Sequence, residues 1–97
     1  MLTGKQRSFL KSKANTMDPM FQLGKNGLTE SFIKQVDVVL ETKELLKISV
    51  LNNSGLDAKE VAIELANELK AEFVQSMGNK LVIYRESKEN KKIELPR

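Results

Sequence analysis

Hydrophobic residues recur along the chain with two different periods, and the alternation of these periods predicts the order of the elements. Spacings of three and four mark helices at residues 3–16, 29–42 and 57–69. Short apolar or alternating runs mark strands at residues 20–23, 45–51, 72–77 and 80–85. The predicted order is therefore α-β-α-β-α-β-β, which places the chain in the α/β class as a single domain.

Residues at the ends of these runs predict where the elements begin and end. Thr3 and Asp57 are suited to be N-caps, and Glu60 follows Asp57 three positions later in the manner of a capping box. Pro19 ends the first helix because it disfavours helical geometry in the residue before it. Gly78-Asn79 predicts a tight hairpin between the last two strands.

The connections between the predicted strands indicate how they assemble. Right-handed β-α-β crossovers place the first three strands parallel to one another, and the hairpin adds an antiparallel strand. We therefore expect a four-stranded mixed sheet with helices packed on it, although the order of the strands does not follow from the sequence. Residues 86–97 are expected to form a polar, mobile tail, in which Ile93 and Leu95 alternate and could add a short edge strand.

A glycine-rich tetrapeptide, Gly24-Lys25-Asn26-Gly27, joins the first predicted strand to the second predicted helix. Its two glycines permit positive φ angles and a close approach by a partner. Its amides lie beside a helix beginning, where unpaired N–H groups and the helix dipole favour an anion, and Lys25 adds a full positive charge. The pattern favours phosphate binding. It is also typical of an ordinary turn, and it is neither a Walker loop nor G-x-G-x-x-G.

Composition narrows the possible functions. The 97 residues are 40% apolar and 30% charged, as expected for one domain with its own core. The chain has neither cysteine nor histidine, which disfavours a hydrolase, a redox enzyme or a zinc module. We expect no cofactor, no metal and no catalysis. No run of apolar residues is long enough to span a membrane, and we expect the protein in the cytoplasm.

Charge is distributed unevenly along the chain. Residues 1–27 have five cations and one acid, residues 28–84 have six lysines and nine acids, and residues 85–97 have five cations and three acids. In the first predicted helix, Arg7 and Lys11 share the outer side with Lys5 further round, whereas Lys13 falls nearer the apolar side. Basic ends indicate a polyanion partner; a solvated charged surface is the alternative.

Two other interpretations remain open. The acids of the second and third predicted helices could form a docking face for a basic ribosomal protein, which would make the chain a protein-protein adaptor; these acids are Asp37, Glu41, Glu44, Glu64 and Glu68. Tyr84 is the single tyrosine and could stack on a base, although a lone aromatic at a strand end is more often part of a core.

Several separated blocks of sequence together resemble a known family. They are L-T-G-K-Q-R at residues 2–7, L-K at 10–11, L-G-K-N-G-L-T-E at 23–30, L-V-I-Y-R at 81–85 and I-E-L-P-R at 93–97. The sequence resembles the CRM domain (chloroplast RNA splicing and ribosome maturation) in its small, free-standing bacterial YhbY-type form. The match covers nearly the whole chain.

The resemblance implies an RNA-binding module whose fold is similar to the C-terminal domain of translation initiation factor three. The family's G-x-x-G loop, likened to that of KH domains, falls on Gly24, Lys25, Asn26 and Gly27, and its basic surface falls on Lys5, Arg7, Lys11 and Arg85. Bacterial stand-alone members are associated with precursors of the large ribosomal subunit. The resemblance thus implies a non-enzymatic protein that binds ribosomal RNA; we expect it to be a monomer that binds neither a membrane nor a small-molecule substrate.

Overall fold

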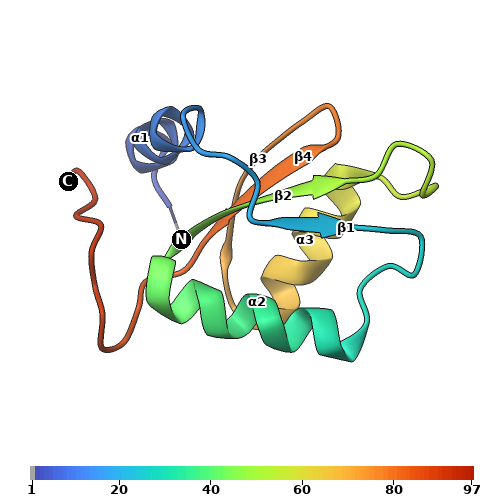
Figure 1. Ribbon diagram of the computed structural model, residues 1–97. Coiled ribbons are helices and arrows are strands. Elements are labelled where there is room, and N and C mark those ends of the chain that lie inside the picture. The colour runs from blue at the N-terminus through green and yellow to red at the C-terminus, as the bar shows by residue number, and fades with distance from the viewer. Residues whose placement is uncertain (1) are drawn as a thin grey trace.

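The computed structural model describes residues 2–97, which form three helices and four strands in the predicted order (Figure 1). The predicted positions are confirmed, and the boundaries differ by a few residues at most. The elements are α1 (Gly4–Ala14), β1 (Phe21–Leu23), α2 (Glu30–Lys43), β2 (Leu45–Val50), α3 (Ala58–Leu69), β3 (Glu72–Met77) and β4 (Lys80–Tyr84).

The four strands form one mixed sheet in the order β1-β2-β4-β3. β1 pairs with β2 in parallel, and β4 runs antiparallel to both of its neighbours, β2 and β3. The hairpin therefore places β4 in the middle of the sheet rather than at its edge. Residues 81–84 are accordingly buried whichever face their side chains point to, as expected for a strand covered on both sides.

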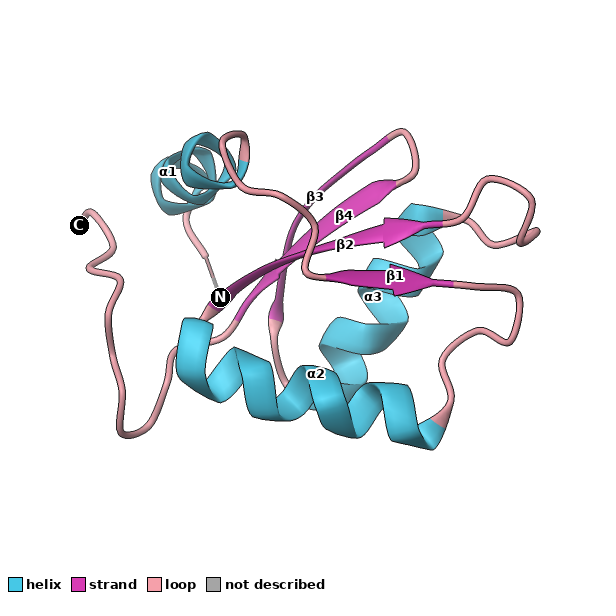
Figure 2. Cartoon of the chain, viewed as in Figure 1, coloured by secondary structure: helices cyan, strands magenta, loops and turns pink. Residues whose placement is uncertain are grey.

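Helices α2 and α3 cover one face of the sheet and form the larger core with it (Figure 2). Leu46, Ile48 and Val50 alternate along β2, point to this face and are fully or almost fully buried. Leu81 and Ile83 of β4 pack in the same cluster. Burial of these aliphatic side chains is the main favourable contribution to folding.

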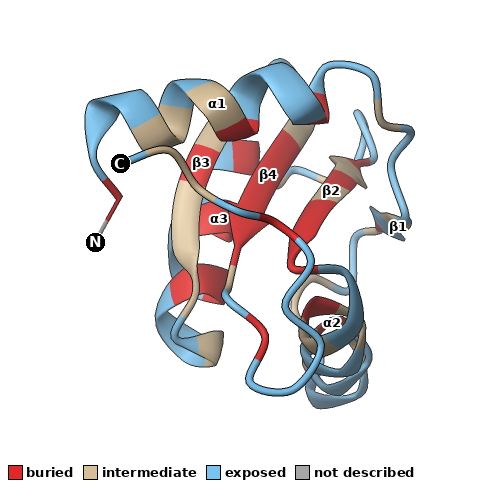
Figure 3. Ribbon diagram, turned by 90° about the vertical axis from the view of Figure 1, so that its left-hand side faces the viewer, coloured by how far each residue is buried: buried red, intermediate tan, exposed pale blue. Residues whose placement is uncertain are grey.

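Helix α1 covers the opposite face and forms a second core there (Figure 3). Its Leu10 and Ala14 pack with Leu45, Val82 and Tyr84 of the sheet. A full capping box begins the helix: the Thr3 hydroxyl accepts from the Gln6 amide, and the Gln6 side chain accepts from the Thr3 amide, both at 3.1 Å. At its other end, Lys47 Nζ of β2 donates to the carbonyls of Ala14 and Met17, both at 3.1 Å.

Residues 86–97 differ from the expected mobile tail, because they fold back beside α1 without forming a strand (Figure 3). Ile93 is buried in the second core, and the Gln6 side-chain amide donates to the Pro96 carbonyl at 3.1 Å. The alternation of Ile93 and Leu95 left a short edge strand open; instead both side chains pack against the α1 core.

The carboxylate that holds residues 86–97 in place is Glu44, at the C-cap of α2. Its side chain is fully buried and accepts from the amides of Ser87 at 2.8 Å, Lys92 at 2.6 Å and Ile93 at 2.8 Å. Burial raises the pKa of the Glu44 carboxyl, but the three amides, helped by Lys91, outweigh it, so that the pKa is lowered. Glu44 also has a positive φ of 68°, which costs backbone strain that these contacts offset.

Candidate nucleic-acid interface

The glycine loop, residues 24–27, is a compact turn at the end of β1. The Gly27 amide donates to the Gly24 carbonyl at 3.1 Å, and the Thr29 amide donates to the Gly27 carbonyl at 3.0 Å. Thr29 then caps α2, because its hydroxyl accepts from the Phe32 amide at 3.1 Å. The loop is thereby fixed directly beside the positive end of α2.

The two glycines of this loop have different structural roles. Gly27 has a φ of +70°, which L-residues rarely adopt, so that the turn itself favours glycine there. Gly24 does not have a positive φ, and a Cβ added to it would lie 3.6 Å from a Leu51 methyl group, an ordinary contact. The fold therefore does not require glycine at position 24, whereas close approach by a partner would.

Lys25 and Asn26 form the exposed tip of the loop. Within residues 2–97, their backbone amides donate to no protein acceptor. The tip thus presents two free N–H groups, one ammonium group and one side-chain amide at a helix beginning. These are the groups that hold a phosphate oxygen in protein anion sites.

Of the predicted cations of α1, two are exposed to solvent and one contacts the sheet. Lys5 and Lys11 are exposed, whereas Arg7 is half-buried and its Nε donates to the Phe73 carbonyl of β3 at 3.3 Å. Lys13, which the spacing placed near the apolar side, is exposed, and its Nζ lies 5.6 Å from the centre of the Phe9 ring.

The glycine loop and Arg7 lie at opposite edges of the sheet (Figure 1). Arg7 contacts β3 at Phe73, in the same row as Leu46, whereas Leu23 at the loop lies in the row of Val50. Phe73 and Leu23 are three strand spacings of about 4.8 Å apart across the sheet and four residues of about 3.3 Å apart along the strands. The distance between them is therefore on the order of 20 Å. The structure therefore does not bring them into one cluster.

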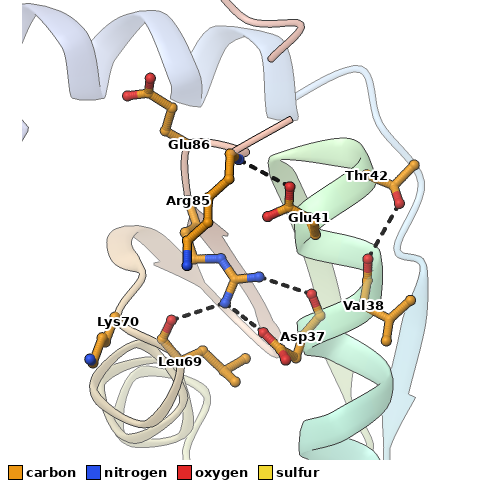
Figure 4. A pocket seen from close by; sticks show the side chains of 9 residues that line it. Asp37, Val38, Glu41, Thr42, Leu69, Lys70, Arg85 and Glu86 are labelled. Atoms are coloured by element: carbon orange, nitrogen blue, oxygen red, sulfur yellow. Dashed lines mark hydrogen bonds and ion pairs between the residues drawn. The ribbon is translucent and has the colours of Figure 1, made fainter. Parts of the chain in front are cut away.

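Arg85 directly follows β4, and its guanidinium group binds other residues of the protein (Figure 4). Its guanidinium donates to the Asp37 carboxylate at 2.7 Å, the Asp37 carbonyl at 2.9 Å and the Leu69 carbonyl at 3.1 Å. It thus joins α2 to the end of α3 at one wall of an open hollow of about 640 Å³. The structure does not bring Arg85 together with the glycine loop.

The acids of α2 that suggested an adaptor surface are largely used inside the protein. Asp37 pairs with Arg85, and Glu44 is buried. Glu41 accepts from the Ser87 hydroxyl at 2.7 Å and from the amides of Lys88 and Glu89, and these hydrogen bonds, led by that of Ser87, lower the pKa of its carboxyl. Fewer free carboxylates remain on α2 for a basic partner.

Tyr84 belongs to the core rather than to an exposed surface. It is almost fully buried against α1, where burial and the nearby carboxylates of Glu44 and Glu86 raise the pKa of its hydroxyl to about 12. A base therefore has no access to its ring in this structure.

Several residues that shape the site could not be singled out in the sequence. Lys47 orients α1 by binding its last carbonyls, and Asn79 ties the hairpin to β2 by donating to the Val50 carbonyl at 2.9 Å. The available signal was the mixed face of β2, where lysine and serine interrupt an apolar strand. That pattern predicts one buried and one mixed side of the strand, but it does not identify the partners of the polar side chains.

Three helices, a four-stranded mixed sheet and a glycine loop exposed just before α2 define a small single-domain α/β module. Residues 2–85 match the family model of the CRS1/YhbY (CRM) domain. The chain therefore belongs to the CRS1/YhbY (CRM) domain family, and the resemblance found in the sequence is confirmed.

Relatives and a solved structure agree with this assignment. The chain is 51% identical to the "Probable RNA-binding protein YqeI" of Bacillus subtilis, covering 99% of this chain and 100% of that one. It is 40% identical to an "RNA-binding protein" of Haemophilus influenzae, covering 99% and 96%. The solution structure of the hypothetical protein SAV1595 from Staphylococcus aureus matches with a TM-score of 0.83 and 54% identity, covering 99% and 100%. In residues 2–97, no helix combines the length and apolar character that crossing a membrane requires.

Proposed function

We propose that this protein binds RNA, that the glycine loop and the exposed lysines of α1 hold the RNA backbone, and that the RNA is ribosomal RNA of the large-subunit precursor in the cytoplasm. The observation on which the proposal depends is the exposed Lys25-Asn26 tip, with its free amides, in a chain whose relatives are named as RNA-binding proteins. The ribosomal partner follows from the family resemblance stated above.

The chemistry of the site suits the RNA backbone better than the bases. The amides of Lys25 and Asn26 and the Lys25 ammonium group bind phosphate oxygens, while Lys5 and Lys11 neutralise further phosphates along the strand. Contacts of this kind position an RNA without reading its sequence. Specificity then comes from RNA shape and from the side chain of Asn26, and the proposal includes no catalysis.

Salt dependence tests the electrostatic part of the proposal. If about four phosphates are neutralised, the logarithm of the affinity for purified large-subunit ribosomal RNA should fall with the logarithm of the salt concentration at a slope of roughly −3. Filter binding over a range of potassium chloride concentrations measures the slope. An affinity that does not change with salt would contradict the proposal.

Reversal of the Lys25 charge tests the loop itself. Lys25→Glu should weaken binding by on the order of tenfold or more, because it replaces a phosphate contact by a repulsion. Lys59→Glu is the matched control, since Lys59 is an exposed lysine of α3 that belongs neither to the glycine loop nor to α1. Equal losses in the two variants would indicate that net charge, and not the loop, determines binding.

Sedimentation of cell extracts tests the ribosomal partner. The wild-type protein should sediment with precursors of the large subunit and should leave them after nuclease treatment. Retention of ribosomal proteins by the chain after thorough nuclease treatment would instead favour the adaptor.

A further inference from the structure

One row of side chains crosses all four strands on the α1 face of the sheet. Gln22 of β1 is in register with Ser49 of β2, Ser49 with Lys80 of β4, and Lys80 with Met77 of β3. Partners in register point to the same face, and this face is opposite to that of Ile48 and Leu81. These four residues, Gln22, Ser49, Lys80 and Met77, are called the open row below.

The open row lies beyond the part of the sheet that α1 covers. Helix α1 runs across the strands and packs on Val82 and Val74, and Lys47 donates to the Ala14 carbonyl at its end. Among residues 2–97, no helix lies over the next row toward the β3-β4 turn (Figure 1). Met77 is 68% exposed, Gln22 is exposed, and Ser49 and Lys80 are half-exposed. Part of the sheet face is thus accessible to a partner.

The two flanks of α1 border different surroundings. Since 3.6 residues make one turn, Arg7 and Lys11 lie to one side of the buried Leu10, and Gln6 and Lys13 lie to the other. The second flank adjoins residues 86–97, because Gln6 donates to the Pro96 carbonyl and Lys13 shares a hollow with Ile93. The Arg7 and Lys11 flank therefore faces the open row.

The open row also reaches the glycine loop. Gly24 follows Gln22 by two residues and so lies on the same face, where Leu51 is its neighbour. Leu51 is 39% exposed and offers an apolar contact beside the loop. One path leads from Lys25, over Leu51 and the open row, toward Lys11 on the nearer flank of α1.

We infer that a single RNA strand lies along this path, with Lys80 binding a phosphate midway between the glycine loop and α1. The inference rests on the proposed function and names the surface that joins two cationic groups lying far apart. Charge complementarity supports RNA as the occupant, because the open row contains a lysine and no carboxylate and both of its borders are cationic. Lys80 Nζ donates to the side-chain oxygen of Asn79 at 3.5 Å, a long and weak hydrogen bond that leaves the ammonium group available to a phosphate.

Site-specific crosslinking tests the path directly. Benzoylphenylalanine is introduced at Gln22, at Met77 or, as a control, at Ile63, an exposed residue of α3 on the other face. Each protein is mixed with a labelled RNA hairpin that has a single-stranded loop and is irradiated. Crosslinks at positions 22 and 77 but not at 63 are expected. Crosslinking at position 63 alone would overturn the inference.

Charge removal at Lys80 gives a second, independent measurement. Lys80→Gln should weaken binding of the same hairpin about fivefold and reduce the salt slope by about one, whereas Lys59→Gln should change neither. Thermal melting verifies that both variants fold. If Lys80→Gln binds like the wild type while Lys25→Glu loses binding, the open row is not a contact and the proposed function stands. If the wild-type protein does not bind the hairpin, the proposed function fails as well.

Discussion

The two ends of α2 differ in whether the backbone amides near them have an acceptor within the protein. Just before its N-terminal end, the amides of Lys25 and Asn26 in the exposed glycine loop have no acceptor among residues 2–97. At the C-terminal end, the carboxylates of Glu41 and Glu44 bind the amides of residues 86–97 and bury part of that segment. At the C-terminal end the N–H groups therefore hold a carboxylate of the protein itself, and at the N-terminal end they are the groups for which we propose a phosphate of RNA.

This comparison implies that the two ends respond differently to mutation. Removal of a carboxylate at the C-terminal end, from Glu41 or Glu44, removes hydrogen bonds that stabilise the fold. If the proposed function is right, a change in the glycine loop at the N-terminal end should alter RNA binding with little effect on the fold. The predictions below test that difference.

The largest effect is expected for Glu44→Gln. A glutamine of the same size keeps one acceptor oxygen but places an NH₂ group against amide donors, so that at least one buried amide loses its acceptor. We expect the free energy of unfolding to fall by about 2–4 kcal/mol, as measured by urea denaturation. Glu41→Gln changes the half-buried carboxylate of the same anchor and should have a smaller effect. Equal stability of wild type and Glu44→Gln would show that Glu44 does not anchor the segment.

Acidification should produce the same loss in the wild-type protein. The folded-state pKa of Glu44 is lowered, so its contribution is complete above the ordinary value of 4.5 and disappears as the pH falls through the lowered pKa. The stability difference between wild type and Glu44→Gln should therefore be constant near neutral pH and shrink below pH 4.5. Urea denaturation of both proteins at several pH values measures this. A difference that persists at the lowest pH would contradict the assignment.

The sequence predicts the elements well because their signals are local. Thr3 and Asp57 cap the helices as expected, and the faces of β2 follow from its alternation. The position of β4 between β2 and β3 is not predictable in this way, because the hairpin is equally consistent with an edge position. The likeness to the C-terminal domain of translation initiation factor three stays a prediction.

Parts of the site depend on partners that lie far away in the sequence. Glu41 and Glu44 look like solvated acids at a helix end, yet they bind amides more than forty positions later. Arg85 looks like a free cation, yet Asp37 and the Leu69 carbonyl bind its guanidinium. The glycine loop was found because its signal, two glycines before a helix beginning, is contained in four residues. Its RNA partner stays a prediction.

The smallest effects on stability are expected when alanine replaces either glycine of the glycine loop. These substitutions also test the loop most directly. Gly27→Ala should cost about 1 kcal/mol of unfolding free energy, because φ there is +70°. Gly24→Ala should leave the free energy of unfolding within about 0.5 kcal/mol of the wild type, since its Cβ meets an ordinary contact of 3.6 Å.

Gly24→Ala should nevertheless weaken RNA binding, although it hardly changes stability. A methyl group at position 24 projects toward the face where the RNA strand is proposed to pass, so affinity for RNA should fall several-fold in a protein that is otherwise as stable as the wild type. Filter binding and thermal melting on the same preparation measure both quantities. Full affinity in Gly24→Ala would mean that no RNA approaches this backbone closely, and the contact would then have to be made by Lys25 and Asn26 at the tip.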